Sequence, residues 1–146
     1  MTARARRLCA ACGFPGHFAG TCRKYAGQRF DHRRMMPAPV SPDALPRPDI
    51  VLVTHAHTDH MDPDTLGPLR ARFPDLPFVV PAARLDAARA RIGGDAALVP
   101  VDAGDTLEPL PGLSLQVLPA AHESFEQDEA GRHAFLGYAF ASGGAR

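Results

Sequence analysis

The stretch of sequence from residue 51 to 62, VLVTHAHTDHMD, joins an apolar run to three histidines and two aspartates. Imidazole nitrogens and carboxylate oxygens suit Zn, Mn or Fe. On an extended backbone His55 and His57 point to the same side, so both rings can reach one ion. Asp59 and His60 come after the predicted strand, in a loop that can direct their side chains to a second ion. The pattern predicts a metal site, and the alternative is a solvated polar loop.

Two such ions can do hydrolytic chemistry. At a separation of about 3.5–4 Å they can share a hydroxide and polarise a substrate oxygen. His122 in AAHES ends a predicted strand, 113–121, and can lie at the same edge as His55. Glu123 can orient His122 or be solvated. His133 is a weaker candidate, which we expect to be an exposed residue at the entry to a strand.

A second ligand pattern lies in CAACGFPGHFAGTC, residues 9–22. The spacing C-x2-C-x4-H-x4-C is that of a zinc knuckle, a closed Cys3His structural site. Knuckles bind single-stranded nucleic acid. Coincidental spacing is the alternative, because Ala10 stands where knuckles usually have an aromatic residue. The four candidate ligands are Cys9, Cys12, His17 and Cys22.

Charge is distributed unevenly along the chain. Residues 1–34 hold eight Lys/Arg and one acid, a net charge of +7, and the remainder has a net charge of −7. Arg33 and Arg34, with Arg29 and His32 beside them, are candidates to bind a phosphate or carboxylate substrate, because guanidinium grips such anions bidentately. A solvated basic loop is the other interpretation.

The elements that must position the metal ligands follow from hydrophobic runs and turn residues. We expect a basic, irregular segment over 1–34, a proline-rich connector over 35–49 and a domain over 50–146. Strands interspersed with two helices predict the α/β class. Pro81 is expected in the first turn of the second helix. The predicted strands are 49–55, 77–81, 97–101, 105–110, 113–121 and 133–142, and the predicted helices are 62–73 and 81–94.

The composition excludes several classes of protein. At 146 residues and 45% hydrophobic content the chain has the size and composition of one globular domain. No apolar run reaches the ~20 residues that span a bilayer, and the N-terminus lacks the pattern of a signal peptide. We therefore expect a cytoplasmic protein, no membrane partner, and cysteines that are not disulfide-bonded.

The segment HAHTDH resembles the H-x-H-x-D-H signature of the metallo-β-lactamase fold. The wider stretches RKYAGQRFDHRRMMPAPV, THAHTDHMDPDTL and LPAAHESFEQDEAGRHAFLGYAF resemble the branch of L-ascorbate-6-phosphate lactonase-like hydrolases. The resemblance covers about residues 22–142. It implies an αββα fold with His55, His57 and His122 on a first metal, and Asp59 and His60 on a second. It also implies that Asp59 orients the attacking water and shuttles its proton.

The activity that the resemblance implies is metal-dependent hydrolysis. One or two Zn or Mn ions would present a hydroxide that attacks a lactone, ester or phosphoester. The family also has a later strand with an aspartate that bridges both metals, and a later histidine; the sequence ends at Arg146, where that strand would begin. We therefore expect a partial domain of about one β-layer with two helices, an incomplete second site, and reduced or no activity.

Three kinds of partner are compatible with the sequence. The first is a small-molecule substrate, with an anionic one favoured by Arg33 and Arg34. The second is another copy of the chain, because an uncovered sheet tends to associate. Nucleic acid enters only under the alternative function, a zinc-knuckle protein that binds single strands and carries a vestigial hydrolase segment.

Overall fold

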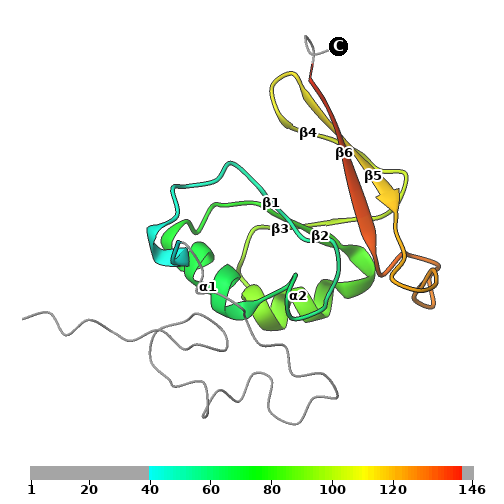
Figure 1. Cartoon of the computed structure of the whole chain (residues 1–146), viewed down its shortest axis with the longest axis horizontal. Coiled ribbons are helices and arrows are strands. Elements are labelled where there is room, and N and C mark those ends of the chain that lie inside the picture. Colours follow the sequence, from blue (N-terminus) through cyan, green and yellow to red (C-terminus); the bar gives the residue numbers. More distant parts are fainter. Residues whose placement is uncertain (1–39, 143–146) are drawn as a thin grey trace, which may run out of the picture. The chain divides into compact units, whose positions relative to one another are not determined.

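The computed structural model describes residues 40–142 (Figure 1). The chain divides into two units after Leu45. From the first unit the description covers only residues 40–45, with the short 3-10 helix η2 (Pro42–Ala44), whose first turn is capped by the side chain of Ser41. The predicted basic segment and the start of the proline-rich connector lie outside the described residues.

The second unit confirms the predicted α/β class with two α-helices. Its strands form two three-stranded sheets. None of the helices in residues 40–142 is long and apolar enough to cross a membrane. The elements are β1 (Val51–Leu52), α1 (Pro63–Arg72), β2 (Phe78–Pro81), η3 (Ala82–Arg84), α2 (Leu85–Ile92), β3 (Leu98–Val101), β4 (Thr106–Leu110), β5 (Leu113–Pro119) and β6 (Leu136–Ser142).

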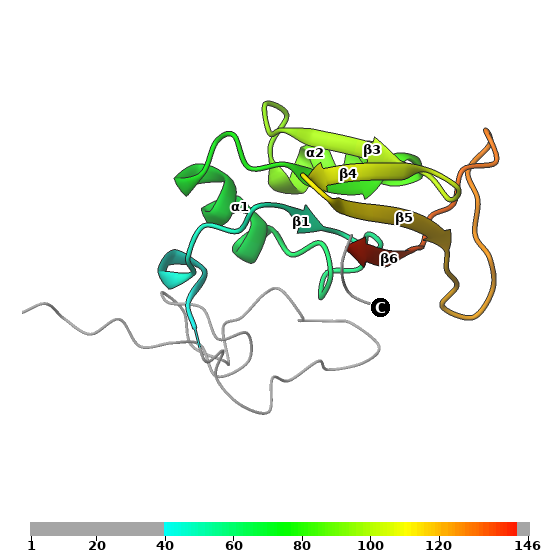
Figure 2. The same ribbon diagram turned by 90° about the horizontal axis from the view of Figure 1, so that it is seen from above.

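The first sheet is parallel, with the order β1-β2-β3. Val51 pairs with Phe78, and Phe78 with Leu98. Each connection between neighbouring strands carries a helix, α1 between β1 and β2 and α2 between β2 and β3 (Figures 1 and 2). Parallel strands joined in this way have all their carboxyl ends at one edge of the sheet, which is where sites of α/β proteins are usually built.

The second sheet is antiparallel, with the order β4-β5-β6. Its first hairpin turns at Pro111-Gly112, as predicted. Gly112 has a φ of 75°, in the left-handed region that a residue without a Cβ adopts most easily. β6 runs back along the whole of β5, from Leu113 paired with Ser142 to Pro119 paired with Leu136.

The apolar core lies between the two sheets. Val79 of β2 and Val101 of β3 pack with Val117 of β5 and Leu136 of β6, and all four side chains are buried. The other face of the first sheet is covered by helices, since α2 contacts β2 and β3 and Ala88 is fully buried. The central strand β2 is therefore covered on both faces, which fits its continuous run of buried residues.

Three local predictions were wrong. Pro81 is the last residue of β2 and precedes the short helix η3, so it is not in the first turn of α2. The strand predicted from residue 133 begins at Leu136, because residues 133–135 are used in contacts with loops. The strand predicted over 49–55 was expected to be covered on both faces, but β1 spans only Val51–Leu52. β2, predicted as a second buried strand, is central and buried. β1 is half-buried, since within the described residues it pairs on one side only.

Candidate metal centre

The histidine-rich loop connects β1 to α1. The backbone N–H groups of His60 and Met61 both donate to the His57 carbonyl, at 3.1 and 2.8 Å, which folds the loop into a tight turn. Asp62 then ends the loop by capping α1: its carboxylate accepts from the backbone N–H of Asp64 at 3.3 Å and the hydroxyl of Thr65 at 2.7 Å. The loop is thus held between a strand and a capped helix.

The turn brings three of the predicted metal ligands together. One ligand atom from each of His55, His57 and Asp59 lies within 4.8 Å of the other two. Ligands at about 2.0–2.2 Å from a zinc ion lie roughly 3–4 Å apart, and two ions in a shared site lie about 3.5–4 Å apart, so this spacing suits ligands of one ion or of two adjacent ions. Two imidazoles and a carboxylate form a donor set that fits Zn or Mn.

The two other predicted metal ligands, His60 and His122, lie next to this set. The ring centroid of His60 lies 4.0 Å from that of His55, and its Nε2 lies 3.6 Å from the Asp59 carboxylate. The ring of His122 lies 5.4 Å from that of His57. His122 follows β5, and the hydrogen bond from Ala120 N–H to the Phe135 carbonyl, 3.1 Å long, holds this end of β5 near the site.

Phe135 forms an apolar surface against three of these histidines, and the sequence patterns did not point to it. Its ring centroid lies 4.9 Å from that of His55, 5.7 Å from His57 and 6.2 Å from His122. Phe135 is 7% exposed. It therefore keeps water from one side of the ligand cluster and limits the positions that the rings can adopt.

The electrostatic environment keeps His55 neutral. Burial, followed by the neighbouring His60 and His57 rings, lowers the pKa of His55 to about 4, although the Asp59 carboxylate opposes the shift. A neutral imidazole has a free lone pair, which is the state that a metal requires. His55 is 8% exposed and is therefore the best-shielded of the predicted ligands.

The second sheet fixes the start of the loop through its backbone. The hydroxyl of Tyr138 donates to the Val53 carbonyl at 2.8 Å, and the N–H of Leu136 donates to the Thr54 carbonyl at 2.9 Å. Burial raises the pKa of Tyr138, so its hydroxyl remains a donor at all ordinary pH values. The position of His55 thus depends on β6, which lies more than 80 residues away in the sequence.

Arg91 of α2 holds the other side of the loop. Its Nη1 donates to the Ala56 carbonyl and lies 3.5 Å from the Met61 carbonyl. These two carbonyls flank the residues that carry His57, Asp59 and His60. Arg91 is half-buried, and its guanidinium satisfies hydrogen-bonding groups of the backbone that secondary structure does not pair. No local pattern in the sequence indicated this contact.

His133 lies in a different place from the one we predicted. It is half-buried, and Asp102 at the end of β3 accepts from its backbone N–H at 2.8 Å and lies 3.1 Å from its Nδ1. Burial opposes ionisation of Asp102, but the hydrogen bonds from His133 and Ala103 outweigh it, so the pKa of Asp102 is below its usual value. This pair anchors the 120–135 loop, which carries His122, to the carboxyl edge of the first sheet.

Other predicted site residues are not part of this cluster. Glu123 is exposed, and within residues 40–142 no hydrogen bond joins it to His122. The anion-binding candidates Arg33 and Arg34 lie outside the described residues. So do the four candidate ligands of the zinc knuckle, Cys9, Cys12, His17 and Cys22.

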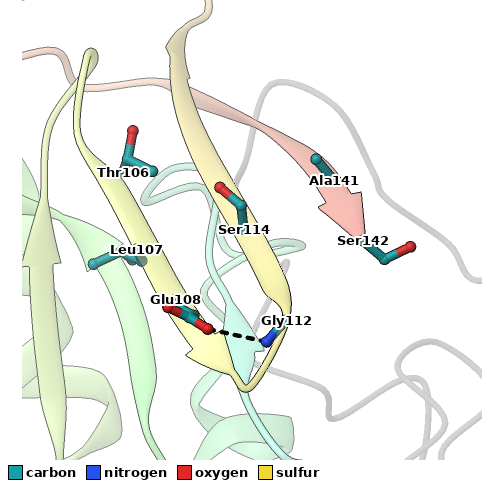
Figure 3. A pocket seen from close by; sticks show the side chains of 7 residues that line it. All are labelled: Thr106, Leu107, Glu108, Gly112, Ser114, Ala141 and Ser142. Atoms are coloured by element: carbon teal, nitrogen blue, oxygen red, sulfur yellow. Dashed lines mark hydrogen bonds between the residues drawn. The ribbon is translucent and has the colours of Figure 1, made fainter. Parts of the chain in front are cut away.

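A hollow of about 540 Å³ lies at the opposite end of the second sheet from the histidines (Figure 3). Glu108 in its wall accepts a hydrogen bond from the Gly112 N–H at 3.0 Å and so stabilises the hairpin turn. The lining contains no histidine or cysteine and belongs to the hairpin end of the sheet. Its residues are Thr106, Leu107, Glu108, Gly112, Ser114, Ala141 and Ser142.

Comparison with solved structures gives two similar chains. One is a proposed metal-dependent hydrolase from Parabacteroides distasonis, 22% identical with a TM-score of 0.46; the match covers 69% of this chain and 42% of that one. The other is Zn2+-bound PqqB from Methylobacterium extorquens, 20% identical with a TM-score of 0.46, with 65% and 35% covered. The chain thus spans less than half the length of either protein.

Comparison with protein families gives a match over most of the chain. The model of the beta-lactamase superfamily domain matches residues 14–146. The match includes the histidine loop, the two sheets and His122, and it begins after Cys9 and Cys12. The chain therefore belongs to the beta-lactamase superfamily, and its two-sheet α/β unit has the metallo-β-lactamase fold.

Proposed function

We propose that this chain is a metal-dependent hydrolase of the L-ascorbate-6-phosphate lactonase-like branch of the superfamily. The observation that carries the proposal is the convergence of ligand atoms from His55, His57 and Asp59 within 4.8 Å, directly after β1. His60 and His122 lie beside them and supply further nitrogen ligands. The sequence stretches around the loop and around His122 support the assignment to this branch.

The ligand set divides between two ions. His55, His57 and His122 would hold the first, and Asp59 and His60 would contribute to a second. Zn or Mn fits these donors. When bound, such an ion polarises a substrate oxygen and lowers the pKa of water.

The chain's own residues would do the remaining work. Asp59 is the exposed carboxylate of the ligand cluster, so it can orient a water molecule and accept its proton. The water oxygen attacks the carbonyl carbon of a lactone or ester, or the phosphorus of a phosphoester. The bond to the leaving oxygen then breaks, and that oxygen takes up a proton. Phe135 excludes water from the opposite side of the rings.

We propose a small-molecule substrate with an acyl or phosphoryl bond to oxygen. An anionic substrate would be gripped by Arg33 and Arg34, which precede the described residues and carry part of the +7 charge of residues 1–34. A second copy of the chain is a further candidate partner, because Phe140 near the end of β6 is 56% exposed.

Hydrolysis of chromogenic substrates tests this proposal. The purified chain is stripped of metal, reloaded with Zn or Mn, and assayed with a nitrophenyl ester, a simple lactone and a nitrophenyl phosphodiester. We expect metal-dependent turnover of at least one substrate, which Asp59→Asn abolishes and the exposed control Asp86→Asn leaves intact. Reduced rates are consistent with the proposal, whereas turnover that persists without metal, or that Asp59→Asn leaves unchanged, would contradict it.

A second candidate function rests on the C-x2-C-x4-H-x4-C spacing of residues 9–22. Under this alternative, a zinc knuckle binds single-stranded nucleic acid, helped by the basic charge around it. The family match begins at residue 14, so His17 and Cys22 fall within it whereas Cys9 and Cys12 do not. Salt-sensitive binding of a labelled single-stranded oligonucleotide, lost in the Cys9→Ser/Cys12→Ser double variant, would support this function.

A further inference from the structure

Thr54, immediately before the first histidine of the loop, contacts both halves of the ligand cluster. Its hydroxyl oxygen lies 2.9 Å from Nδ1 of His55 and 3.1 Å from Nδ1 of His60. His55 is assigned to the first ion and His60 to the second. One hydroxyl group therefore connects a ligand of each predicted metal position.

In both His55 and His60, Nδ1 contacts the Thr54 hydroxyl and Nε2 does not. Their centroids are 4.0 Å apart with an angle of 41° between the planes, so the rings lie side by side. Both Nδ1 atoms are turned towards the threonine oxygen. The nitrogen left to bind a metal is therefore Nε2 in both rings, and Nε2 of His60 is 3.6 Å from the Asp59 carboxylate.

The Thr54 hydroxyl can form only certain hydrogen bonds, and this limits which ring nitrogens of His55 and His60 carry a proton. A hydroxyl has one hydrogen to donate and two lone pairs that accept. If it donates to one Nδ1, that neutral ring must carry its own proton on Nε2 and cannot bind a metal there. Both rings have a free Nε2 lone pair only when each donates its Nδ1–H to the threonine oxygen.

We propose that Thr54 is a positioning residue that accepts Nδ1–H from both His55 and His60 and so fixes both rings in the metal-binding tautomer. The inference rests on the proposed function, because it concerns how the chain holds the metal. Partners of this kind, on the ring nitrogen that faces away from a metal, fix ring orientation and tautomer in many metal sites. What is specific here is that a single side chain sets both rings together.

The backbone of Thr54 is fixed independently of its hydroxyl. Its carbonyl accepts from Leu136 N–H at 2.9 Å, and the preceding carbonyl of Val53 accepts from Tyr138 at 2.8 Å. Removing the hydroxyl should therefore leave the backbone at Thr54 unchanged and affect only the rings of His55 and His60. A substitution of Thr54 can thus test the hydroxyl alone.

The test uses three variants of the full chain. Thr54→Val removes the hydroxyl at nearly constant volume, and Thr54→Ser keeps it. Thr58→Val is the matched control, because Thr58 lies in the same turn and its side chain makes no hydrogen bond within the described residues. The first measurement is the 15N NMR spectrum of the histidine rings in metal-free protein at about pH 8, above the usual pKa of a histidine side chain. The second is zinc affinity by competition with a chelator.

We expect the metal-free wild-type protein, Thr54→Ser and Thr58→Val to carry the proton on Nδ1 of both His55 and His60. In Thr54→Val the proton should shift towards Nε2, and zinc affinity should fall by about 10–100-fold. Thr54→Ser should bind within a few-fold of the wild type.

A proton mainly on Nε2 of either ring in the wild type would overturn the inference, and so would a Thr54→Val variant that binds zinc as tightly as the wild type. The wild-type spectrum decides the matter even if Thr54→Val fails to fold. A wild-type chain that binds no zinc would instead contradict the proposed function, while the ring tautomers would still decide the role of Thr54.

Discussion

The two halves of the predicted metal centre differ in how firmly they are held. His55 is 8% exposed and packs against Phe135, whereas the side chains of His60 and Asp59 are 46% and 68% exposed. The inner position is thus anchored by one buried ligand, His55, while His57 and His122 are themselves exposed, and the outer half lies in solvent on the turn. A first ion should find its ligands nearly in place, but a second must first order them.

The difference follows from which elements support each half. The segment before His55 is held by two hydrogen bonds from β6, and β6 itself packs in the core through Leu136. The outer half is supported by the turn's own backbone and by Arg91. Side chains ordered by packing lose less entropy on binding than side chains ordered by the ligand itself, which favours the inner position.

The largest expected effect comes from removing one ligand from each half. His55→Ala should weaken the binding of the first zinc ion by about 100-fold or more, beyond the roughly 10–100-fold typical of residues that only support a ligand. His60→Ala should leave this first ion bound within a few-fold of the wild type and weaken only a second. Isothermal titration with zinc measures both. Equal losses in the two variants would contradict the distinction between the halves.

A smaller effect is expected from Arg91, which supports the outer half. Arg91→Met keeps the apolar stem but leaves the Ala56 and Met61 carbonyls without the guanidinium, which should cost about 2 kcal/mol of unfolding free energy. Zinc affinity should fall by about 10-fold. Urea unfolding of the metal-free protein measures the first quantity.

Arg89→Met is the matched control for this substitution. Arg89 lies on the same helix, is exposed, and bonds to Asp86 at 3.2 Å. An exposed pair of this kind contributes under about 1 kcal/mol, so this variant should unfold nearly as the wild type does. If Arg91→Met also unfolds like the wild type, Arg91 does not support the loop.

The smallest effect concerns the Asp102–His133 pair, which anchors the loop that brings His122 to the inner half. Because the pKa of folded Asp102 is below its usual value, its ionised form stabilises the folded state. This contribution is full above the unfolded pKa of about 3.9 and is lost as pH falls through the lower folded value. Asp102→Asn should therefore cost about 1 kcal/mol at neutral pH, and the cost should shrink below about pH 4.

Unfolding of the wild type and Asp102→Asn in urea across this pH range measures the difference. A cost that stays constant from neutral to acid pH would mean that the charge on Asp102 is not what stabilises the loop. A small decrease in zinc affinity in Asp102→Asn, of a few-fold, is expected because His122 would be less well placed.

Local sequence patterns were sufficient for the order of the elements and for the ligand loop. The apolar run before His55 predicted a strand, seen as the short β1, and the residues after the histidines predicted a helix over 62–73, which the structure confirms as α1. Both signals depend on residues a few positions apart. The four ligand-type residues of the loop could be chosen in the same way, because their types and spacing indicate metal chemistry, whereas His122 was chosen from its place at a predicted strand end and from the family resemblance.

The supports of the loop could not be predicted in this way. Tyr138 is 85 positions from Val53, and Arg91 is 35 positions from Ala56. Neither side chain carries a local signal, since tyrosine in a strand and arginine on a helix are both ordinary. The division of the strands into two sheets also depends on contacts between distant residues, such as Val79 with Val117.

The central claim is that the histidine loop holds the metal, and its most direct test is the zinc content of the purified chain. We predict that the wild type retains zinc after dialysis, that His55→Ala/His57→Ala loses it, and that Cys9→Ser/Cys12→Ser retains it. Elemental analysis of the three proteins, prepared side by side, gives the answer. Zinc content that is unchanged in the histidine variant and lost in the cysteine variant would contradict the account.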